Sequence, residues 1–153
     1  MTTMRPARPD EADSLTELAV RSKSYWGYDA EFLDRARFDL TVSAENAVKG
    51  NVFVAENEGA VAGFYSLDDD RDTPELTALF VEPVSMGKGH GRLLFAHAAG
   101  EARARGGRVM IIHSDPFAES FYLAQGAVRV GAIPSPVDAA RLLPLLHLSL
   151  PNE

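Results

Sequence analysis

The 153-residue sequence predicts one α/β domain built on a mixed, mostly antiparallel sheet of about six to seven strands. Apolar residues recur at helical spacing in the N-terminal part and at the alternating spacing of strands after residue 51. Near the middle, a strand-like run over 73–81, a helical pattern over 89–105 and an apolar run over 108–112 predict a right-handed βαβ crossover. Hairpin-like pairs of strands before and after the crossover make the sheet mixed, with helices expected on both faces.

Two amphipathic helices are expected after a short extended segment at the N-terminus. The first covers residues 10–24, with Asp10 as its N-cap, and the second covers residues 30–40, with Asp29 as its N-cap. Apolar side chains at helical spacing mark the buried faces: Leu15, Leu18 and Ala19 in the first helix, and Phe32, Ala36 and Leu40 in the second.

Strand periodicity governs most of the remaining chain. The runs over 51–57 and 60–67 predict a hairpin whose turn contains Gly59, and Gly106 with Gly107 ends the central helix. The elements expected after the crossover are a short helix over 117–127 and two strands over 128–133 and 142–150. The last strand is apolar and is predicted to lie at the sheet edge, where it could pair with a second copy of the chain in a homodimer.

Composition argues against several classes of protein. The chain has no cysteine, which excludes disulfides, thiolate ligands and a cysteine nucleophile, and its four histidines lack a ligand-like spacing, so no metal site is expected. A net charge of −7 argues against broad nucleic-acid binding, and no apolar run approaches the roughly 20 residues of a membrane span. Because the N-terminus lacks the apolar core of a signal peptide, a cytoplasmic protein is expected.

The segment "MGKGHGRLL" combines glycines with basic residues where a predicted strand is followed by a helix. A helix N-terminus offers unpaired N–H groups and a partial positive charge, and Gly87, Gly89 and Gly91 remove the Cβ atoms that would keep an anion away. Residues 88–108 contain five basic residues and one acidic residue, a local charge of +4 in an acidic protein. This pattern favours a polyanionic ligand, although a tight strand-to-helix turn alone would also explain the glycines.

Two common nucleotide-binding loops do not match this segment. A Walker A loop requires G-x-x-x-x-G-K-[ST], but Glu82 stands where the first glycine belongs and Gly89 where the serine or threonine belongs. The dinucleotide fingerprint G-x-G-x-x-G fails at Arg92, where the third glycine is required. Neither of these common loops therefore accounts for the glycine turn.

The segment "VEPVSMGKGHGRLL" is instead similar to the motif [QR]-x-x-G-x-[GA] of the GNAT superfamily of N-acetyltransferases, which follows a strand ending in V-x-P. Gly89 and Gly91 occupy the two small positions, and Met86 replaces the usual glutamine or arginine. The resemblance implies that backbone amides of the loop bind the pyrophosphate of acetyl-coenzyme A (acetyl-CoA), less tightly because of Met86. The cofactor-binding residues that it implies are Leu79, Phe80, Val81, Gly87, Lys88, Gly89, His90, Gly91, Arg92 and Ser120.

A second segment, residues 114–127, resembles the GNAT signature N-x-x-A-x-x-F-Y-x-x-x-G-F. In the family, its short helix carries a tyrosine that lies beside the thioester sulfur. The matching residues are Ala118, Phe121, Tyr122 and Gly126. The chain departs from the signature at Asp115, which replaces the asparagine, and at Ala127, which replaces the final aromatic residue. Many relatives also have asparagine where Phe117 stands.

Together the motifs imply a GNAT fold and the transfer of an acetyl group from acetyl-CoA to a primary amine, by direct attack within a ternary complex. Tyr122 matches the general acid that protonates the departing thiolate. Glu75 is the favoured general base, because it lies eleven residues before Met86, in the register of the catalytic glutamate of related histone acetyltransferases. Glu82 and a chain of water molecules are the alternatives to Glu75.

The strand before the glycine turn is expected to line the channel for the pantetheine arm of the cofactor. If this strand is regular, Glu75, Thr77, Leu79 and Val81 share the face that points along the channel. In the family, backbone N–H groups of this strand, here about Leu79–Val81, bind the pantetheine and the thioester oxygen. Side chains at these positions carry no signal of that role.

The aromatic segment "YWGY" between the first two helices corresponds to a region that lines the acceptor pocket in GNAT proteins, so Tyr25, Trp26 and Tyr28 are predicted to bind the substrate. The alternative is that they only seal the helices against the sheet. Arg141, in the loop before the last strand, could pair with a substrate carboxylate or stay solvated. Aromatic residues in an acidic protein favour a small cationic amine, and a protein N-terminus, a lysine side chain, an amino acid or an aminoglycoside would each fit.

A non-catalytic protein that binds coenzyme A as a sensor or scaffold is the alternative function. Met86 and the substitutions at Asp115 and Phe117 favour that alternative. Tyr122 and Glu75 favour an enzyme, because a protein that only binds needs neither a proton donor nor a proton acceptor. The sequence therefore predicts an N-acetyltransferase.

Overall fold

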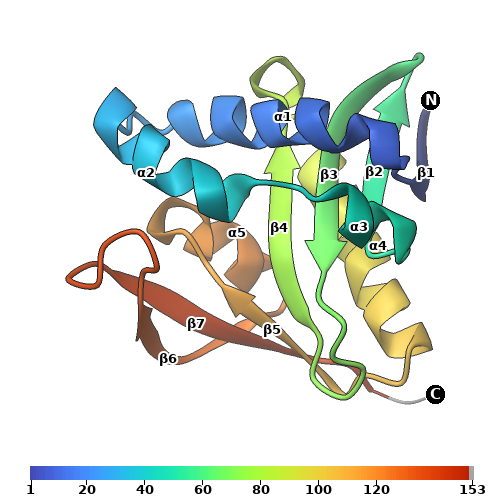
Figure 1. Cartoon of the computed structure of the whole chain (residues 1–153). Coiled ribbons are helices and arrows are strands. Elements are labelled where there is room, and N and C mark those ends of the chain that lie inside the picture. The colour runs from blue at the N-terminus through green and yellow to red at the C-terminus, as the bar shows by residue number, and fades with distance from the viewer. Residues whose placement is uncertain (152–153) are drawn as a thin grey trace.

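The computed structural model describes residues 1–151, with a seven-stranded mixed sheet in the order β1-β2-β3-β4-β5-β7-β6 (Figure 1). The strands are β1 (Thr2–Pro6), β2 (Val52–Asn57), β3 (Ala60–Leu67), β4 (Glu75–Val81), β5 (Val109–His113), β6 (Val128–Pro134) and β7 (Leu142–Ser149). The helices are α1 (Ala12–Ser24), α2 (Ala30–Leu40), α3 (Ala44–Val48), α4 (His90–Ala104) and α5 (Glu119–Ala124). Neighbouring strands are antiparallel except β4 and β5, which are parallel and joined through α4. The predicted fold is confirmed.

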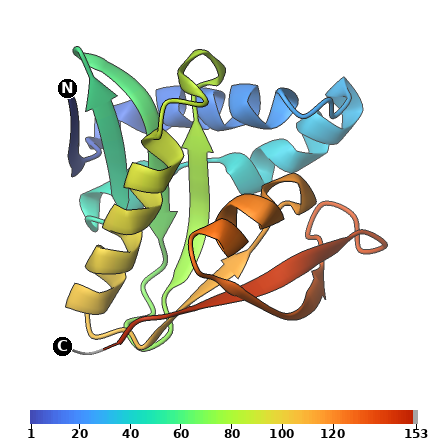
Figure 2. The ribbon, with the colours of Figure 1, turned by 180° about the vertical axis from the view of Figure 1, so that it is seen from behind.

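Helices cover both faces of the sheet and enclose two apolar cores. On the face toward the viewer in Figure 1, α1 and α2 pack on a core that includes Leu15, Leu18 and Phe64. Figure 2 shows α4 and α5 on the opposite face, where Leu94 and Tyr122 belong to the second core. Each fully buried leucine contributes about 2 kcal/mol of hydrophobic stabilisation. Within residues 1–151, no helix has both the length and the apolar character needed to cross a membrane.

The first two helices begin where local interactions allow. α2 starts after Asp29, whose carboxylate accepts a hydrogen bond from the amide of the third helical residue at 2.8 Å, as predicted. The predicted N-cap of the first helix, Asp10, is wrong. Residues Pro9–Glu11 form a short 3-10 turn, which displaces the start of α1 to Ala12.

A short helix, α3, has no counterpart among the elements that the sequence predicts. Its signal is local, because Ser43 caps it by accepting a hydrogen bond from the Asn46 amide at 3.0 Å. The helix has only five residues, too few to show an amphipathic period. The capping serine, Ser43, is therefore the sequence feature from which α3 could have been predicted.

The last strand, β7, lies inside the sheet rather than at its edge, which corrects the sequence-based prediction. It pairs with β5 on one side and with β6 on the other, so β6 forms this edge of the sheet. The apolar character of β7 serves burial instead, as at Leu146, which is fully buried. β7 therefore has no free edge to offer a second copy of the chain, and a homodimer stays an untested prediction.

A bulge interrupts β4 at Thr77. Along the β3–β4 ladder, Ser66 pairs with Ala78 and Leu67 pairs with Leu76, which leaves Thr77 without a pairing partner. The Thr77 hydroxyl instead lies 2.6 Å from the Ser66 hydroxyl. The extra residue changes the side-chain alternation along the strand.

The bulge corrects the prediction that Glu75, Thr77, Leu79 and Val81 share one face. Leu76 packs in the same core as Leu79 and Val81, on the face that α4 and α5 cover. Since neighbouring side chains at the start of the strand alternate, Glu75 points to the opposite face, which α1 and α2 cover. The side chain of the candidate base, Glu75, therefore lies on the opposite face of the sheet from the side chains of Leu79 and Val81.

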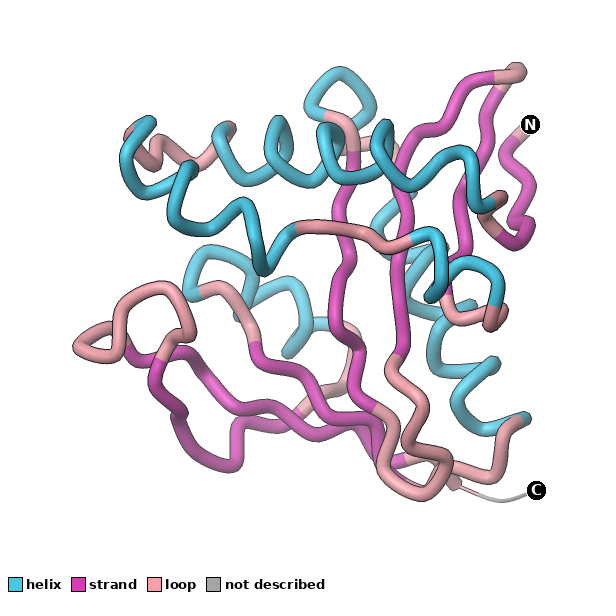
Figure 3. The backbone as a smooth tube through the Cα atoms, in the orientation of Figure 1, coloured by secondary structure: helices cyan, strands magenta, loops and turns pink. Residues whose placement is uncertain are grey.

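The parallel strands β4 and β5 separate after a short contact. They pair only at Glu75 with Ile111 and at Leu76 with Ile112. Beyond these pairs, β4 continues beside β3, while β5 turns away together with β7 and β6 (Figure 3). The backbone groups of β4 that face β5 after Leu76 are thus left without a strand partner.

Candidate active site

A cleft of about 1100 Å³ lies between the diverging strands. Its walls are the end of β4, the glycine turn, α5, parts of α1 and α2, and the loop between β6 and β7. Because α4 and α5 lie on one face and α1 and α2 on the other, the cleft passes through the sheet. Two molecules can therefore enter from opposite faces and meet between β4 and β5.

The glycine turn closes one end of the cleft at the N-terminus of α4. Gly87 and Gly89 have φ angles of 78° and 87°, which residues with a Cβ rarely adopt, and Gly89 is the N-cap of α4. The first amide N–H groups of this 15-residue helix have no acceptor within the helix. Gly91 packs against α5, and a Cβ there would lie 3.4 Å from the Phe121 ring. The turn thus combines free amide donors with open space for an anion.

Most of the predicted cofactor-binding residues lie on the cleft. They are Leu79, Phe80, Val81, Gly87, Gly89, His90, Gly91, Arg92 and Ser120. Lys88 is exposed and is not among the residues that line it. Met86, which departs from the family motif, also lines the cleft and is half-buried beside the turn.

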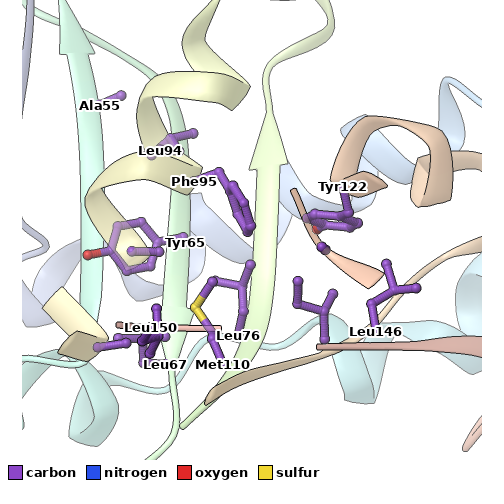
Figure 4. Close-up of a cluster of buried hydrophobic side chains, with 14 residues drawn as sticks. Ala55, Tyr65, Leu67, Leu76, Leu94, Phe95, Met110, Tyr122, Leu146 and Leu150 are labelled. Atoms are coloured by element: carbon purple, nitrogen blue, oxygen red, sulfur yellow. The ribbon is translucent and has the colours of Figure 1, made fainter. Parts of the chain in front are cut away.

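Tyr122 lies on α5 at the edge of the apolar core, above Leu146 of β7 (Figure 4). Only 7% of the residue is exposed, and this burial raises the pKa of its hydroxyl, so the group keeps its proton. The side chain lines the cleft, and the structure records no hydrogen bond from its hydroxyl to another residue within 1–151. The proton is thus available to a ligand atom in the cleft.

Glu75 begins β4 on the face that α1 and α2 cover. Its carboxylate lies 3.4 Å from Nδ1 of His113 on β5, and both residues line the cleft. Partial burial raises the pKa of Glu75 above its usual value, an effect that the charge of His113 opposes. The alternative base, Glu82, forms a two-point ion pair with Arg21 and is not among the lining residues. Glu75 is therefore the better placed of the two carboxylates to accept a proton from a substrate.

The aromatic residues predicted to bind the substrate separate into two groups. Trp26 lines the cleft and stacks on Phe117, with ring centroids 5.5 Å apart and planes 2° from parallel. Tyr25 is 59% exposed and contacts Trp26 by its edge, whereas Tyr28 stacks on Phe32. Neither tyrosine is among the lining residues. Of the three, Trp26 is thus the one placed to touch a substrate.

A charged cluster on the acceptor side joins segments that no sequence motif connects. The Lys23 ammonium and the Tyr28 hydroxyl donate hydrogen bonds to Oδ2 of Asp115, at 2.8 and 2.9 Å. Arg141 donates to the Tyr28 oxygen, and its guanidinium lies 3.5 Å from the same Asp115 oxygen. Burial alone would raise the pKa of Asp115, but the hydrogen bond and charge of Lys23, together with hydrogen bonds from the Phe117 amide and the Tyr28 hydroxyl, lower it. Lys23 and His113 are candidates that the sequence does not reveal, because only the fold brings them to their partners.

Comparison with known proteins decides the family. The model of the acetyltransferase (GNAT) domain matches residues 16–134, which include both motifs and most of the cleft. The chain belongs to this family. The resemblance on which the fold and the acetyltransferase class were predicted is confirmed.

Individual relatives agree with this assignment. The chain is 30% identical over 125 residues to the 5-NmdU N-acetyltransferase of Pseudomonas phage PaMx11, across 80% of this chain and 84% of that protein. PaiA N-acetyltransferase from Thermoplasma acidophilum, solved in complex with coenzyme A, shares the fold with a TM-score of 0.79 at 17% identity, over 97% and 99% of the two chains. YncA from Salmonella typhimurium, solved with acetyl-CoA, has a TM-score of 0.72 at 25% identity, over 100% and 96%. This GNAT protein is therefore an N-acetyltransferase.

Acetyltransferases of the GNAT family use acetyl-CoA, which confirms the predicted cosubstrate. The residues of this chain fit it. The glycine turn offers amide donors to a pyrophosphate, and the cleft leads from the turn past the unpaired backbone of β4 to Tyr122. Among the residues that the structure describes, no group of three or more His, Asp or Glu side chains is arranged to bind a metal ion.

Proposed function

We propose that this N-acetyltransferase moves the acetyl group of acetyl-CoA directly to a primary amine while both substrates are bound in one ternary complex. The observation that carries the proposal is the cleft that passes through the sheet between β4 and β5. The glycine turn holds the donor on the side of α4 and α5, and the acceptor enters on the side of α1 and α2. Because each substrate has its own entrance, neither must leave before the other binds.

In this proposal, Glu75 is the general base. It points to the acceptor side, and its raised pKa suits a group that must take a proton from an ammonium. Nδ1 of His113 lies 3.4 Å from this carboxylate and helps to hold it in position. Once the proton has moved to Glu75, the neutral nitrogen can form the new C–N bond as the C–S bond breaks.

Tyr122 is the general acid on the opposite side. Burial keeps its hydroxyl protonated, and the hydroxyl gives this proton to the departing sulfur. The nitrogen loses two protons in all: Glu75 takes the first before the attack, and the second, released as the amide forms, restores through solvent the proton that Tyr122 gives to the sulfur. The backbone N–H groups of Leu79 and Val81, which point away from β3, stabilise the negative charge that develops on the carbonyl oxygen.

The acceptor in this proposal is a primary amine that contacts Trp26. The name of the phage relative makes 5-NmdU the first compound to test. The cytoplasm is the proposed location. A homodimer would have β6, rather than β7, as the free sheet edge on this side of the molecule.

The test begins with calorimetric titration of acetyl-CoA, followed by measurement of coenzyme A release with 5-NmdU and with a panel of primary amines. Micromolar binding together with amine-dependent release supports the proposal. Tyr122→Phe should lower kcat by about 10-fold to 100-fold and leave the dissociation constant of acetyl-CoA within about 3-fold, because only the proton donor is lost.

The matched control is Tyr65→Phe. This tyrosine belongs to the same core as Tyr122, but its hydroxyl lies 2.7 Å from Nδ1 of His97 and does not face the cleft. The control should therefore keep the wild-type kcat. Binding of acetyl-CoA without any turnover would favour a coenzyme A sensor, and absence of binding would refute both functions.

A further inference from the structure

We infer that the acceptor carries an oxyanion, a phosphate or a carboxylate, roughly 0.7 nm from its amine, and that Lys23 and Arg141 bind this oxyanion. The inference rests on the proposed function, because it takes the amine to lie at Glu75. It is carried by the distribution of charge along the acceptor side of the cleft.

One end of the acceptor side is acidic. Glu75 and Asp39 both line the cleft. A smaller cavity of about 140 Å³, lined by Asp39 together with Thr77 and Ala78, places this aspartate over the beginning of β4. Two carboxylates in this position attract the ammonium form of an amine.

The other end is a cluster of donors around Asp115. One oxygen of this carboxylate lies 2.8 Å from the Lys23 ammonium, 2.9 Å from the Tyr28 hydroxyl and 3.5 Å from the Arg141 guanidinium. Asp115 thus shows how an oxyanion is held in this place. The side chains of Lys23 and Arg141 are only 14% and 22% exposed, so water screens their charges incompletely.

This cluster has more positive charge and more donors than Asp115 uses. Two cations surround one carboxylate, which leaves a net charge of +1. Within residues 1–151, the recorded hydrogen bonds use one side-chain N–H of Lys23 and one of Arg141, whose guanidinium has five. Both cations line the cleft. The remaining donors can hold a second oxyanion, supplied by the substrate.

The distance between the two ends sets the size of the acceptor. Glu75 pairs with Ile111 on β5, and Asp115 follows four residues later. The Glu75 carboxylate reaches forward along β5 to within 3.4 Å of Nδ1 of His113, and two extended residues, roughly 7 Å of chain, separate His113 from Asp115. An acceptor that spans the two ends therefore carries its amine and its oxyanion roughly 0.7 nm apart.

Three probes that differ at one end test the inference: 6-aminohexyl phosphate, 6-aminohexanoate and 6-aminohexanol. Each is titrated by calorimetry into protein saturated with coenzyme A, so that the glycine turn is already occupied. We expect the phosphate or the carboxylate probe to bind at least about 10-fold more tightly than the alcohol. The stronger of these two identifies the kind of oxyanion. Equal affinities, or no binding of any probe, would overturn the inference.

Substitutions separate recognition from a structural role of the cluster. Arg141→Gln should lower the affinity for the two oxyanion probes by about 10-fold and leave the affinity for 6-aminohexanol unchanged. Arg103→Gln removes the same charge from an exposed position on α4 outside the cleft and should change neither affinity. Asp115→Asn should act in the opposite direction. It should raise the affinity for the oxyanion probes by about 3-fold or more, because the competing carboxylate is gone. If both Arg141→Gln and Asp115→Asn weaken these probes, the cluster only fastens loops together and the inference is wrong.

The coenzyme A titration distinguishes failure of this inference from failure of the proposed function. If coenzyme A does not bind, the proposed function fails, and the probes still report on oxyanion binding to the protein alone. If coenzyme A binds and amines are acetylated without any preference for an oxyanion, only the inference fails.

Discussion

The two ends of the cleft are built in different ways. The end proposed to bind the cofactor consists of consecutive residues, 87–92, whose backbone conformation would supply the binding groups. The acceptor end consists of side chains from three distant segments, which meet at Asp115. Contiguous backbone leaves a motif in the sequence, whereas side chains assembled by the fold leave none. The chemistry of the donor could therefore be predicted in more detail than that of the acceptor.

This difference predicts how each end responds to substitution. A site made of backbone amides fails when the main chain is distorted or its open space is filled. A site made of side chains keeps its shape when one of them is replaced, and its selectivity changes instead. Substitutions at the cofactor end should thus alter affinity, and those at the acceptor side should alter turnover and selectivity.

The largest effect is expected at Gly89. Gly89→Glu strains a residue with a φ of 87° and places a negative charge where the amides of α4 are proposed to bind the pyrophosphate. The affinity for acetyl-CoA should fall by at least about 100-fold, measured by calorimetry, with thermal denaturation to confirm that the variant is folded.

Gly100→Glu is the matched control for this change. It adds the same side chain to the same helix, at a position where a Cβ would meet nothing within 4 Å. Its affinity for acetyl-CoA should equal that of the wild type. A folded Gly89→Glu variant that binds normally would show that the glycines only permit a tight turn.

A second, smaller effect is expected at Glu75. Burial raises the pKa of this carboxylate, so wild-type kcat/KM should fall as the pH decreases through that raised pKa, because the base becomes protonated. Glu75→Gln should lower kcat/KM by about 100-fold at neutral pH, remove this acid limb of the profile and leave acetyl-CoA affinity unchanged.

Glu82→Gln serves as the control for Glu75. It removes a carboxylate from the end of the same strand segment, where its partner is Arg21 and not a residue of the cleft. The pH profile of this variant should match that of the wild type. Wild-type rates in Glu75→Gln would instead assign proton removal to a chain of water molecules.

Most of the fold can be predicted because its signals are local. The bounds of α2 follow from the Asp29 cap and from the spacing of Ala36 and Leu40. The position of β7 between β5 and β6 has no such signal, because it depends on which strands pair in space. The bulge at Thr77 also depends on register with β3, and it decides which face Glu75 occupies.

The site divides in the same manner. Gly89 and Tyr122 stand in motifs, and the structure places both on the cleft. Lys23 is an ordinary basic residue near the end of a helix, and its partner Asp115 is 92 residues away in the chain. The sequence marks Asp115 only by its departure from the second GNAT signature, where asparagine is usual. That departure indicates a changed contact, but it does not indicate that Lys23 is the partner.

The smallest effect is expected at Met86, where the cofactor end departs from the family motif. This side chain lines the cleft next to Gly87, in the position of the usual glutamine or arginine. Met86→Arg should tighten acetyl-CoA binding by about 5-fold, because a guanidinium there can donate charge-assisted hydrogen bonds to the pyrophosphate. Calorimetry at two salt concentrations measures the gain.

Val84→Arg tests whether such a gain comes from contact or from charge alone. Val84 lies in the short turn Pro83–Ser85, which Met86 follows directly, but Val84 is 84% exposed and is not among the residues that line the cleft. A long-range attraction would appear in both variants and would shrink as salt is added, since exposed charges are screened. A gain that is confined to Met86→Arg would place that side chain against the pyrophosphate, and would show that the backbone turn binds the donor without the motif's polar side chain, at reduced affinity. Equal gains would mean that only the amides of the turn touch the ligand.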